Sequence, residues 1–457
     1  MPTILERIVE APAPESGLRL RNTRAADRSQ AGMYPPFRSL RRALIVSEQH
    51  HLTRAAESLG RSQSAITRTI LDLERFLGCE LFERRAAGMI NTRHGDVLFP
   101  RVRAALDQLA GAEPKLRRMS AGSASALRPQ HILQLDIANA SIFVFLALYD
   151  YHDIGRASVS LDIAPSSVRK SIGALERQLG LRLFQRTARD ALVPSDTGRI
   201  LATHLKRALS EIRTGLDELR SVNGRIAGSI RIGVMSTART LVVPRAVHRL
   251  HERHPDIVVS VHWGNYRDLE AALSCGDIDF IVGTLHPEDV DAPDTITQTL
   301  MKDRVEVVAR AGHPLSRAGD LSLKELLSLD WILPPKHFPL RTWFRELLES
   351  KGLHEPRPFI ETASLSILRG TLLESDAVAL STRLQCWHEI VEHRVLDVVP
   401  IAAFSRPRLE RPLYLHLSRR ADATLPPAAE TLCAILADVA SRLDDDRLAA
   451  EWTRATA

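Results

Sequence analysis

Apolar residues recur at helical spacing between residues 37 and 77, and this pattern predicts three consecutive helices. They are expected over residues 37–50, 53–59 and 62–77. Thr53 and Ser62 belong to the residue types that cap helix N-termini, and Gly78 tolerates the positive φ at which a helix ends. The third helix is expected to bury one apolar face and to expose a polar face.

The residues after this unit predict a β-hairpin. Residues 80–84 alternate like a strand, Ala87 and Gly88 form a turn, and residues 90–92 return. Three helices and a hairpin are typical of a winged helix-turn-helix, whose third helix enters the major groove of DNA. The alternative is a small helical bundle with a polar outer face, which explains neither the hairpin nor the repeat described next.

The same pattern occurs a second time in the chain. The thirty residues from Ala55 to Arg84 align without a gap to those from Ala157 to Arg186, and 13 of the 30 positions are identical. Chance similarity does not keep one register over such a length. The chain therefore carries two copies of one small domain.

A long amphipathic helix is expected after the second copy, over residues 195–222. Its apolar residues follow one another at steps of three and four: Leu201, Leu205, Leu209, Ile212, Leu216 and Leu219. Such a seam suits a contact between two helices from different subunits. The alternative is an amphipathic helix that lies on its own domain. The corresponding helix after the first copy, about residues 96–118, is interrupted by Gly111 and Pro114.

The C-terminal half alternates between strand and helix patterns. Strands are expected at 229–234, 257–262, 278–282, 305–309, 331–333, 359–361 and 377–380, with helices at 244–253 and 266–275. This alternation predicts parallel sheets in two α/β lobes with a cleft between them. The chain is expected to cross to the second lobe near residues 298–303 and to return near residues 395–400.

The net charge of +6 is divided unevenly along the chain. Residues 1–230 contain 34 Lys and Arg against 23 Asp and Glu, or +11, and the remainder has 27 against 32, or −5. A basic half suits a polyanion such as DNA, and a mildly acidic half suits the sensing of small molecules.

Other features of the composition exclude several classes of protein. The four cysteines lie far apart, which favours neither a disulfide framework nor a zinc ribbon. No apolar run is long enough to cross a bilayer, and the N-terminus carries acidic residues where a signal peptide is basic. We expect a soluble cytoplasmic protein without a cofactor. Residues 1–32 are expected to be disordered, and Met33 is an alternative start of the chain.

Motifs of common enzymes are absent from the sequence. There is no Gly-x-Ser-x-Gly, P-loop, Gly-x-Gly-x-x-Gly or His-Glu-x-x-His pattern. His248, His251 and His254 form the one cluster that resembles a metal site. A step of six residues is too wide for one site on a straight helix, so a solvated face is the favoured interpretation and a metal site the alternative.

The stretch AAESLGRSQSAITRTILDLERFLGCELFERR, followed by Thr92 and Gly95, resembles the DNA-binding domain of LysR-type transcriptional regulators. The resemblance extends over most of residues 37–445. It implies that Gln63, Ser64 and Thr67 read bases, that Arg68 contacts phosphate, and that Arg84 and Arg85 lie at the wing. The long helix after the wing makes the dimer in this family.

The second copy departs from the family pattern. Pro165 stands where the first copy has Gln63, and Ala164 replaces the Ser62 cap. The DNA contacts implied for this copy are Ser166, Arg169, Lys170 and Arg186. Its cationic residues favour phosphates, so we expect the first copy to read sequence and the second mainly to grip the backbone. A tandem pair is itself unusual for the family.

The C-terminal half is similar to the effector-binding domain of the same family, and the stretch GDIDFIVG at residues 276–283 carries this resemblance. Ligands in such lobes bind beyond the carboxyl ends of parallel strands. The expected effector contacts are Ser236, Thr237, Asn265, Tyr266, Pro334, Pro335 and Ser364. The alternative for any Ser or Thr at a helix start is a plain helix cap. The resemblance implies a small carboxylate, an aromatic acid or a sugar as the effector.

The predicted fold is multidomain: two all-α-type winged helix-turn-helix domains, then a two-lobed α/β domain similar to periplasmic binding proteins. The expected pieces are an extension (1–32), a first winged domain (33–120), a linker (121–134), a second winged domain (135–194), a linker and dimerisation helix (195–223) and an effector-binding domain (229–445). Its first lobe is expected to cover 229–300 and 400–445, and its second lobe 301–399.

The expected function is sequence-specific regulation of transcription in response to an effector bound between the lobes. A sequence-neutral architectural DNA-binding protein and an enzyme that uses the cleft are the alternatives. The expected partners are double-stranded DNA, the effector, and further copies of the chain in a homodimer or homotetramer, with no membrane.

Overall fold

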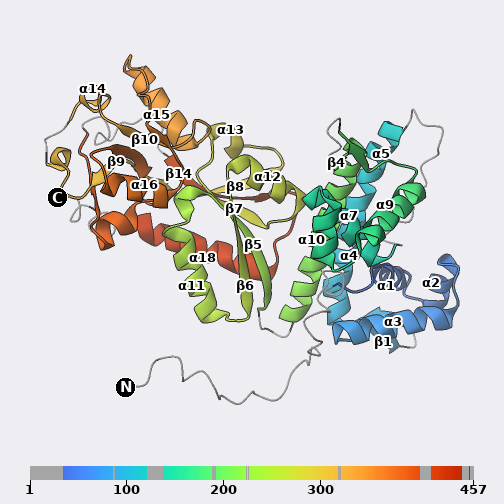
Figure 1. Cartoon of the computed structure of the whole chain (residues 1–457). Coiled ribbons are helices and arrows are strands. Elements are labelled where there is room, and N and C mark those ends of the chain that lie inside the picture. Colours follow the sequence, from blue (N-terminus) through green and yellow to red (C-terminus); the bar gives the residue numbers. More distant parts are fainter. Residues whose placement is uncertain are drawn as a thin grey trace, which may run out of the picture. The chain divides into compact units, whose positions relative to one another are not determined.

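The computed structural model describes residues 34–85, 88–120, 137–187, 192–222, 224, 226–317, 321–401, 413–444 and 452 (Figure 1). The expected extension (1–32) and linker (121–134) lie outside these residues. The chain forms two compact units, one of residues 1–96 with 122–195 and the other of residues 97–121 with 196–457. None of the described helices combines the length and the apolar composition that a membrane crossing requires.

The first unit contains the two copies of the repeat, and each has three helices and a two-stranded wing. The first copy consists of α1 (Phe37–Gln49), α2 (Leu52–Ser58), α3 (Gln63–Leu77), β1 (Phe82–Arg85) and β2 (Gly88–Asn91). The second consists of α7 (Asn139–Tyr151), α8 (Ile154–Leu161), α9 (Pro165–Leu179), β3 (Phe184–Arg186) and β4 (Leu192–Pro194). Both wings are antiparallel, as the alternation in the sequence predicts.

A glutamate shared by both copies joins the third helix to the wing. Oε1 of Glu74 accepts hydrogen bonds from the N–H groups of Leu81, at 2.7 Å, and Phe82, at 3.3 Å. Glu176 makes the same two bonds at the same distances in the second copy. These N–H groups lie at the start of the first strand of each wing, and the carboxylate supplies their acceptor. The glutamate of the repeated Leu-Glu-Arg sequence therefore has the same structural role in both copies.

The starts of the helices confirm one expected cap and correct another. Ser62 accepts a hydrogen bond from the N–H of Ala65, and Gly78 ends α3 in the left-handed conformation, both as predicted. Thr53 was expected to cap the second helix, but α2 begins one residue earlier, at Leu52. Thr53 thus has a helical backbone and cannot take the capping position. In the second copy, Pro165 at the first position of α9 replaces a side-chain cap.

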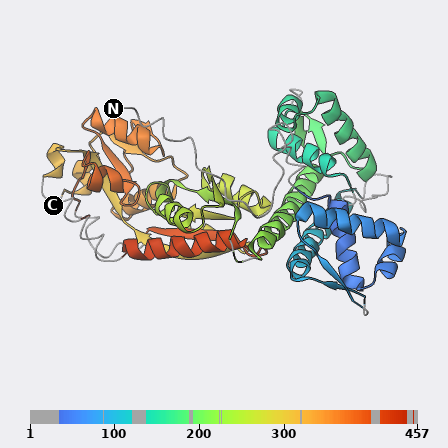
Figure 2. The same ribbon diagram turned by 90° about the horizontal axis from the view of Figure 1, so that it is seen from below.

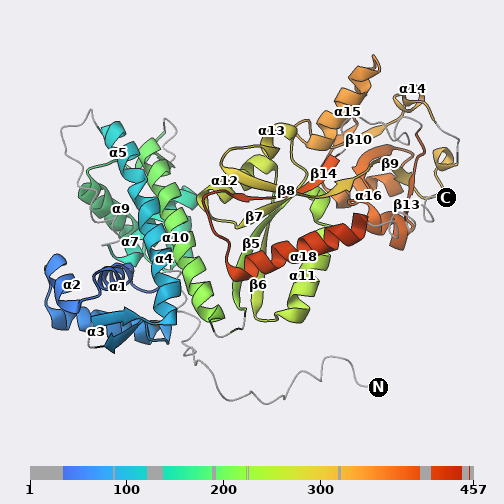
Figure 3. The same cartoon turned by 180° about the vertical axis from the view of Figure 1, so that it is seen from behind.

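The helices that follow the two wings lie side by side in the second unit (Figure 3). These are α4 (Arg93–Ala110), α5 (Ala112–Ser120) and the 26-residue α10 (Asp196–Ser221). Only Gly111 separates α4 from α5. Of the predicted seam, Leu201, Leu205, Leu209, Ile212 and Leu219 are buried within this one chain. Within this one chain, α10 packs against the earlier helices and the first lobe, which is the alternative that the sequence leaves open for this seam.

The first lobe is built on a sheet with strand order β6-β5-β7-β14-β8. Its strands are β5 (Gly228–Val234), β6 (Ile257–Trp263), β7 (Phe280–Gly283), β8 (Thr295–Asp303) and β14 (Leu413–Arg420). Its helices are η3 (Ser236–Ala238), α11 (Val242–Arg253), α12 (Tyr266–Cys275), α13 (Pro287–Val290) and α18 (Pro427–Asp444). The helix α18, red in Figure 2, packs along this sheet and against α11.

The second lobe has a sheet with strand order β11-β10-β12-β9-β13. The strands are β9 (Val305–Arg310), β10 (Trp331–Leu333), β11 (Ile360–Glu361), β12 (Val378–Thr382) and β13 (Leu396–Val398). The helices are η4 (Pro314–Ser316), α14 (Leu323–Leu326), α15 (Pro339–Ser350), α16 (Leu365–Leu373) and η5 (His388–Glu392). One buried apolar cluster contains residues of both sheets, such as Phe280 and Ile332.

Two details of these lobes differ from the sequence-based expectation. Residues 298–303, expected as a crossover, belong to β8 and pair with β14, and the chain enters the second lobe at Arg304. The strand β14 was not predicted, and it is antiparallel to both β7 and β8. Both sheets are therefore mixed rather than wholly parallel. The strand with which the chain enters each lobe from the other, β9 in the second lobe and β14 in the first, is antiparallel to its two neighbours.

Candidate functional site

A groove between α3 and the wing of the first copy brings together the DNA-binding residues that the sequence predicts for it. Its lining includes all six of them: Gln63, Ser64, Thr67, Arg68, Arg84 and Arg85. The helix presents them because Ile66, Ile70 and Leu73 bury its opposite face. Except for Thr67, which is partly buried, their side chains are exposed.

Local hydrogen bonds arrange the polar residues at the start of α3. The hydroxyls of Ser62 and Ser64 are 3.1 Å apart, and Thr67 donates a hydrogen bond to the carbonyl of Gln63 at 3.0 Å. On the wing, Arg85 pairs with Glu83 at 2.8 Å. An exposed Gln can bind an adenine through two hydrogen bonds, and exposed Arg side chains bind phosphate or guanine. The groove has the side chains that major-groove recognition requires.

Further residues line this groove and were not predicted as part of the site. They are His51, Leu52, Thr53, Leu71, Asp72, Arg75, Gly88 and Met89. The sequence could have indicated Leu71, because this apolar residue stands outside the spacing of the buried residues of α3. In the structure Leu71 is 51% exposed. His51 precedes α2 and could be placed beside α3 only by the packing of the two helices.

The predicted residues of the second copy lie on its corresponding surface. Ser166, Arg169 and Lys170 are exposed on α9, and Arg186 is exposed on β3. The opposite face of α9 is buried through Val168, Ile172, Leu175 and Leu179. The second copy therefore offers a more cationic helix, whose first turn is held by Pro165 instead of a serine cap.

A narrow cleft in the second unit lies at the carboxyl ends of strands from both lobes. The predicted residues Ser236, Thr237 and Pro334 line it. Thr237 is buried, and its hydroxyl lies 3.1 Å from that of Thr284. The cavity volume of about 20 Å³ is close to the space of one water molecule. A larger ligand therefore requires the walls of the cleft to separate.

The other predicted effector residues lie outside this lining. Asn265 caps α12 by accepting a hydrogen bond from the N–H of Asp268, and Ser364 caps α16. Tyr266 packs in a buried cluster of the first lobe, and burial raises the pKa of its hydroxyl. Pro335 is not among the lining residues.

Several lining residues of the cleft were not predicted. Among them, Thr284, Phe338, Thr362 and Gln385 carry polar or aromatic groups. Thr284 directly follows β7, so the rule that ligands bind beyond the carboxyl ends of strands could have identified it. Gln385 reaches the cleft from the turn after β12, which no local pattern indicates.

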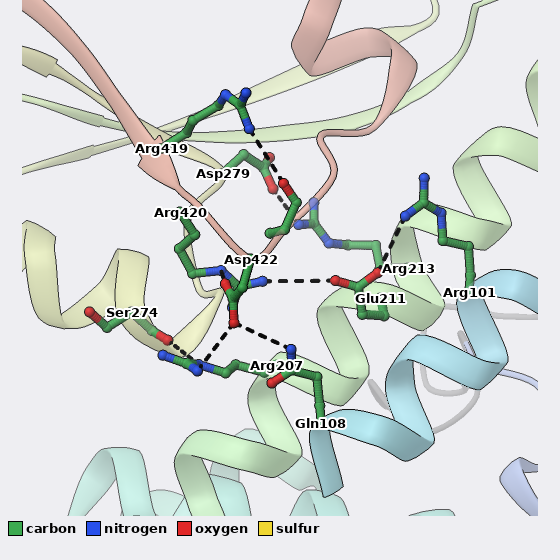
Figure 4. A network of polar contacts seen from close by, with 11 residues as sticks. Arg101, Gln108, Arg207, Glu211, Arg213, Ser274, Asp279, Arg419, Arg420 and Asp422 are labelled. Carbon is green, nitrogen blue, oxygen red and sulfur yellow. Dashed lines mark hydrogen bonds and ion pairs between the residues drawn. The ribbon is translucent and has the colours of Figure 1, made fainter. Parts of the chain in front are cut away.

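A polar network joins the paired helices to the first lobe (Figure 4). Oδ2 of Asp422 lies 3.4 Å from both Nε2 of Gln108 on α4 and Nη1 of Arg207 on α10. Glu211 is buried between Arg101, at 3.5 Å, and Arg420, at 3.9 Å. Burial raises the pKa of Glu211, and the two guanidinium groups oppose this effect. Both helices that follow the wings thus make polar contacts with residues at or just after the end of β14.

The histidine cluster is not supported as a metal site. Within the described part of the chain, no group of three or more His, Cys, Asp or Glu side chains is placed to hold a metal ion. His248 is 72% exposed and lies 3.4 Å from Glu252. This arrangement agrees with a solvated helix face.

Known protein families match the described domains. The family described as LysR substrate binding domain matches residues 223–441. The family described as bacterial regulatory helix-turn-helix protein, lysR family, matches twice, at residues 37–96 and 140–199. The second match coincides with the repeat found in the sequence.

Individual proteins are similar over most or about half of the chain. The HTH-type transcriptional regulator GalR of Pseudomonas putida is 31% identical over 405 residues, which are 89% of this chain and 97% of GalR. GbpR of Azospirillum brasilense is 33% identical over 242 residues, which are 52% of this chain and 70% of GbpR. The crystal structure of full-length CbnR complexed with its target DNA aligns with a TM-score of 0.49 at 14% identity and covers 66% of this chain and 99% of CbnR. The chain belongs to the LysR family of transcriptional regulators, as a member with two tandem helix-turn-helix domains.

Proposed function

We propose that this regulator reads operator DNA mainly with α3 and the wing of its first copy. The observation that carries the proposal is the groove that gathers Gln63, Ser64, Thr67, Arg68 and the wing arginines. Amide and hydroxyl groups supply directional contacts to base edges, and arginines supply phosphate contacts. The second copy, with Arg169 and Lys170 at the equivalent turn, holds the DNA backbone.

The effector binds in the cleft lined by Ser236, Thr237 and Pro334. The lining combines apolar walls, from Phe338 and Leu368 among others, with several hydroxyl groups and one amide. Apolar walls fit a flat ring, and hydroxyl and amide groups fit a carboxylate or a ring hydroxyl. Of the effector classes that the sequence suggests, a small aromatic acid therefore fits this lining better than a sugar, which needs polar groups on most of its surface.

The signal passes from the cleft to the DNA-binding domains through the paired helices. When the lobes separate around a ligand, the end of β14 moves with its sheet, and Asp422 and Arg420 transmit this movement to α4 and α10. Each of these two helices directly follows the wing of one DNA-binding domain in the chain. The protein acts in the cytoplasm, where its DNA lies, and regulates transcription rather than converting the bound ligand.

Genome-wide mapping of bound DNA, followed by footprinting with and without candidate aromatic acids, tests this function. We expect discrete intergenic sites and a change of the footprint when the acid binds. Uniform binding along the genome would instead indicate an architectural protein. Conversion of the bound acid into a product would indicate an enzyme.

A further inference from the structure

The two post-wing helices occupy equivalent positions in the repeat. Thr92 and Ser195 stand at their starts, and each hydroxyl donates a hydrogen bond of 2.6 Å to a carbonyl at the base of its wing, that of Glu80 or Arg182. The second wing is one residue longer, so counterparts in these helices are 103 residues apart. The corresponding pairs are Arg101 and His204, Gln108 and Glu211, and Lys115 and Glu218.

Contacts between these helices are reciprocal. Nη1 of Arg101 lies 3.5 Å from Oε2 of Glu211. The counterpart contact is also present, because Nδ1 of His204 lies 2.6 Å from the carbonyl oxygen of Gln108. Arg101 thus contacts Glu211, the counterpart of Gln108, and Gln108 contacts His204, the counterpart of Arg101.

A second set of contacts repeats this relation one or two turns away. Arg101 forms an ion pair with Glu218, whose counterpart is Lys115. Nζ of Lys115 in turn lies 3.4 Å from Nε2 of His204, the counterpart of Arg101. Two patches that touch each other in this exchanged manner form an isologous interface, the kind that a two-fold axis generates in a symmetric dimer.

The first unit contains an independent sign of the same symmetry. The N–H of Phe37 donates a hydrogen bond of 3.1 Å to Oδ1 of Asn139, which is its own counterpart 102 residues later. Asn139 also donates to the carbonyl of Pro35 at 3.0 Å, and the rings of Tyr34 and Phe37 pack on Phe143. In an isologous pair, a residue that touches its counterpart lies at the two-fold axis.

We infer that a single chain is a complete two-headed DNA-binding unit, whose target is a pair of unlike half-sites bound in one orientation. This inference rests on the proposed function. It adds the number of chains that bind one operator and the arrangement of the two half-sites in that operator. A symmetric dimer presents two identical helices and selects palindromes. Here α3 offers Gln63 and Thr67 where α9 offers Pro165 and Arg169, so the two half-sites differ.

The experiment uses the full-length chain and DNA duplexes that it selects from a random-sequence pool. Native mass spectrometry counts the chains on each selected duplex, and hydroxyl-radical footprinting counts the protected half-sites. We expect one chain for every two half-sites and a consensus sequence that is not palindromic. The ratio of one to two should hold even if chains associate further through other surfaces. One chain per half-site, or a palindromic consensus, overturns the inference and leaves the proposed function standing.

Variants of each copy give a second readout. Replacing Arg169 and Lys170 by Ala should remove protection from one half-site, and replacing Gln63 and Arg68 by Ala should remove it from the other. Each change should lower affinity at least tenfold, while Arg253→Ala, an exposed charge on α11 of the first lobe, leaves both half-sites protected. An unchanged footprint for the α9 variant overturns the inference. Failure of the wild-type chain to select any sequence overturns the proposed function as well.

Discussion

Arg101 of α4 and Glu218 of α10 form a bidentate ion pair across the two helices that follow the wings. Nε of Arg101 lies 3.1 and 2.9 Å from the carboxylate oxygens, and Nη2 lies 2.5 Å from one of them. The side chains are 16% and 18% exposed, so water screens the pair little. The hydrogen bonds that the guanidinium donates to Glu218 are the main cause that raises the pKa of Arg101. This pair joins segments that are 117 residues apart in the chain.

Loss of this pair should destabilise the second unit. In Glu218→Ala, Arg101 stays largely buried with only Glu211 as an anionic partner, so we expect the free energy of unfolding to fall by about 2 to 4 kcal/mol. Glu113→Ala is the matched control, because Glu113 pairs with Arg117 at the exposed surface of α5. It should cost less than about 0.5 kcal/mol. Urea denaturation measures both, and equal losses would contradict the role of the pair.

Gly215 should tolerate no side chain. A Cβ at this position would lie 2.9 Å from Cβ of Arg101 and 3.3 Å from Cδ1 of Leu98, so α4 would have to move away from α10. We expect Gly215→Ala to lower stability by about 1 to 3 kcal/mol. Gly173→Ala in α9 meets no atom within 4 Å and should instead stabilise by up to about 1 kcal/mol. Thermal unfolding of both variants checks the opposite signs.

The two copies should differ in what they contribute to DNA binding. Gln63→Ala removes a directional base contact, and we expect it to reduce discrimination between operator and random DNA by about 1 to 3 kcal/mol. Lys170→Ala removes a phosphate contact and should weaken binding to both DNAs alike, with a smaller dependence on salt. Affinity measurements on both duplexes at several salt concentrations separate these effects. Loss of specificity in Arg169→Ala, with none in Gln63→Ala, would make the second copy the reader.

Effector response should depend on the hydroxyl of Thr237 and be separable from DNA binding. We expect Thr237→Ala to reduce the thermal shift that an aromatic acid produces, and Thr237→Ser, which keeps the hydroxyl, to retain it. Operator affinity without ligand should change by less than about 1 kcal/mol. Ser364→Ala is the control, because it removes a helix cap next to the cleft and should lower stability but not the response. Parallel loss of ligand response and DNA binding would show that Thr237 is structural.

The stability that Glu306 and Asp303 contribute should fall as the pH rises from about 4 to 7. Burial raises the pKa of Glu306 to about 7, although Arg304 and Arg383 oppose this, and burial raises that of Asp303 to about 6. The folded chain therefore holds protons that the unfolded chain releases near pH 4, and the stabilisation is lost as the pH passes the folded pKa. Glu306→Gln should flatten this decline. Glu325→Gln should not, because Ser322 lowers the pKa of Glu325 and keeps it ionised throughout.

Local signals in the sequence identified the elements of the DNA-binding domains, because each of them follows from nearby residues. The Ser62 cap, the Gly78 end and the alternation of the wing concern neighbours in the chain. The partner of α10 could not be identified in this way, since a leucine seam has the same spacing whether it meets another subunit or the same chain. The reciprocal contacts of Arg101 and His204 became visible only in the structure.

The ligand cleft was harder to predict for a related reason. Ser236, Thr237 and Pro334 were found by the position of strand ends, but Gln385 and Thr362 join them through the contact between lobes. The same rule also predicted Asn265 and Ser364, whose side chains cap α12 and α16 by accepting hydrogen bonds from helix N–H groups. The strand β14 was missed although Leu413, Leu415 and Leu417 alternate with polar residues, since its partners β7 and β8 lie more than a hundred residues earlier.

The packing of α4 and α5 against α10 within one polypeptide changes how this regulator responds to its own abundance. When such helices belong to separate molecules, their association is a second-order process, and dilution separates the two DNA-binding domains. Here the association is unimolecular, and the intervening chain holds one partner near the other at a fixed effective concentration. If one chain is a complete DNA-binding unit, as we infer, the fraction of chains with both domains paired is the same for a few molecules per cell as for thousands. Pairing of the two domains should then require no minimum protein level.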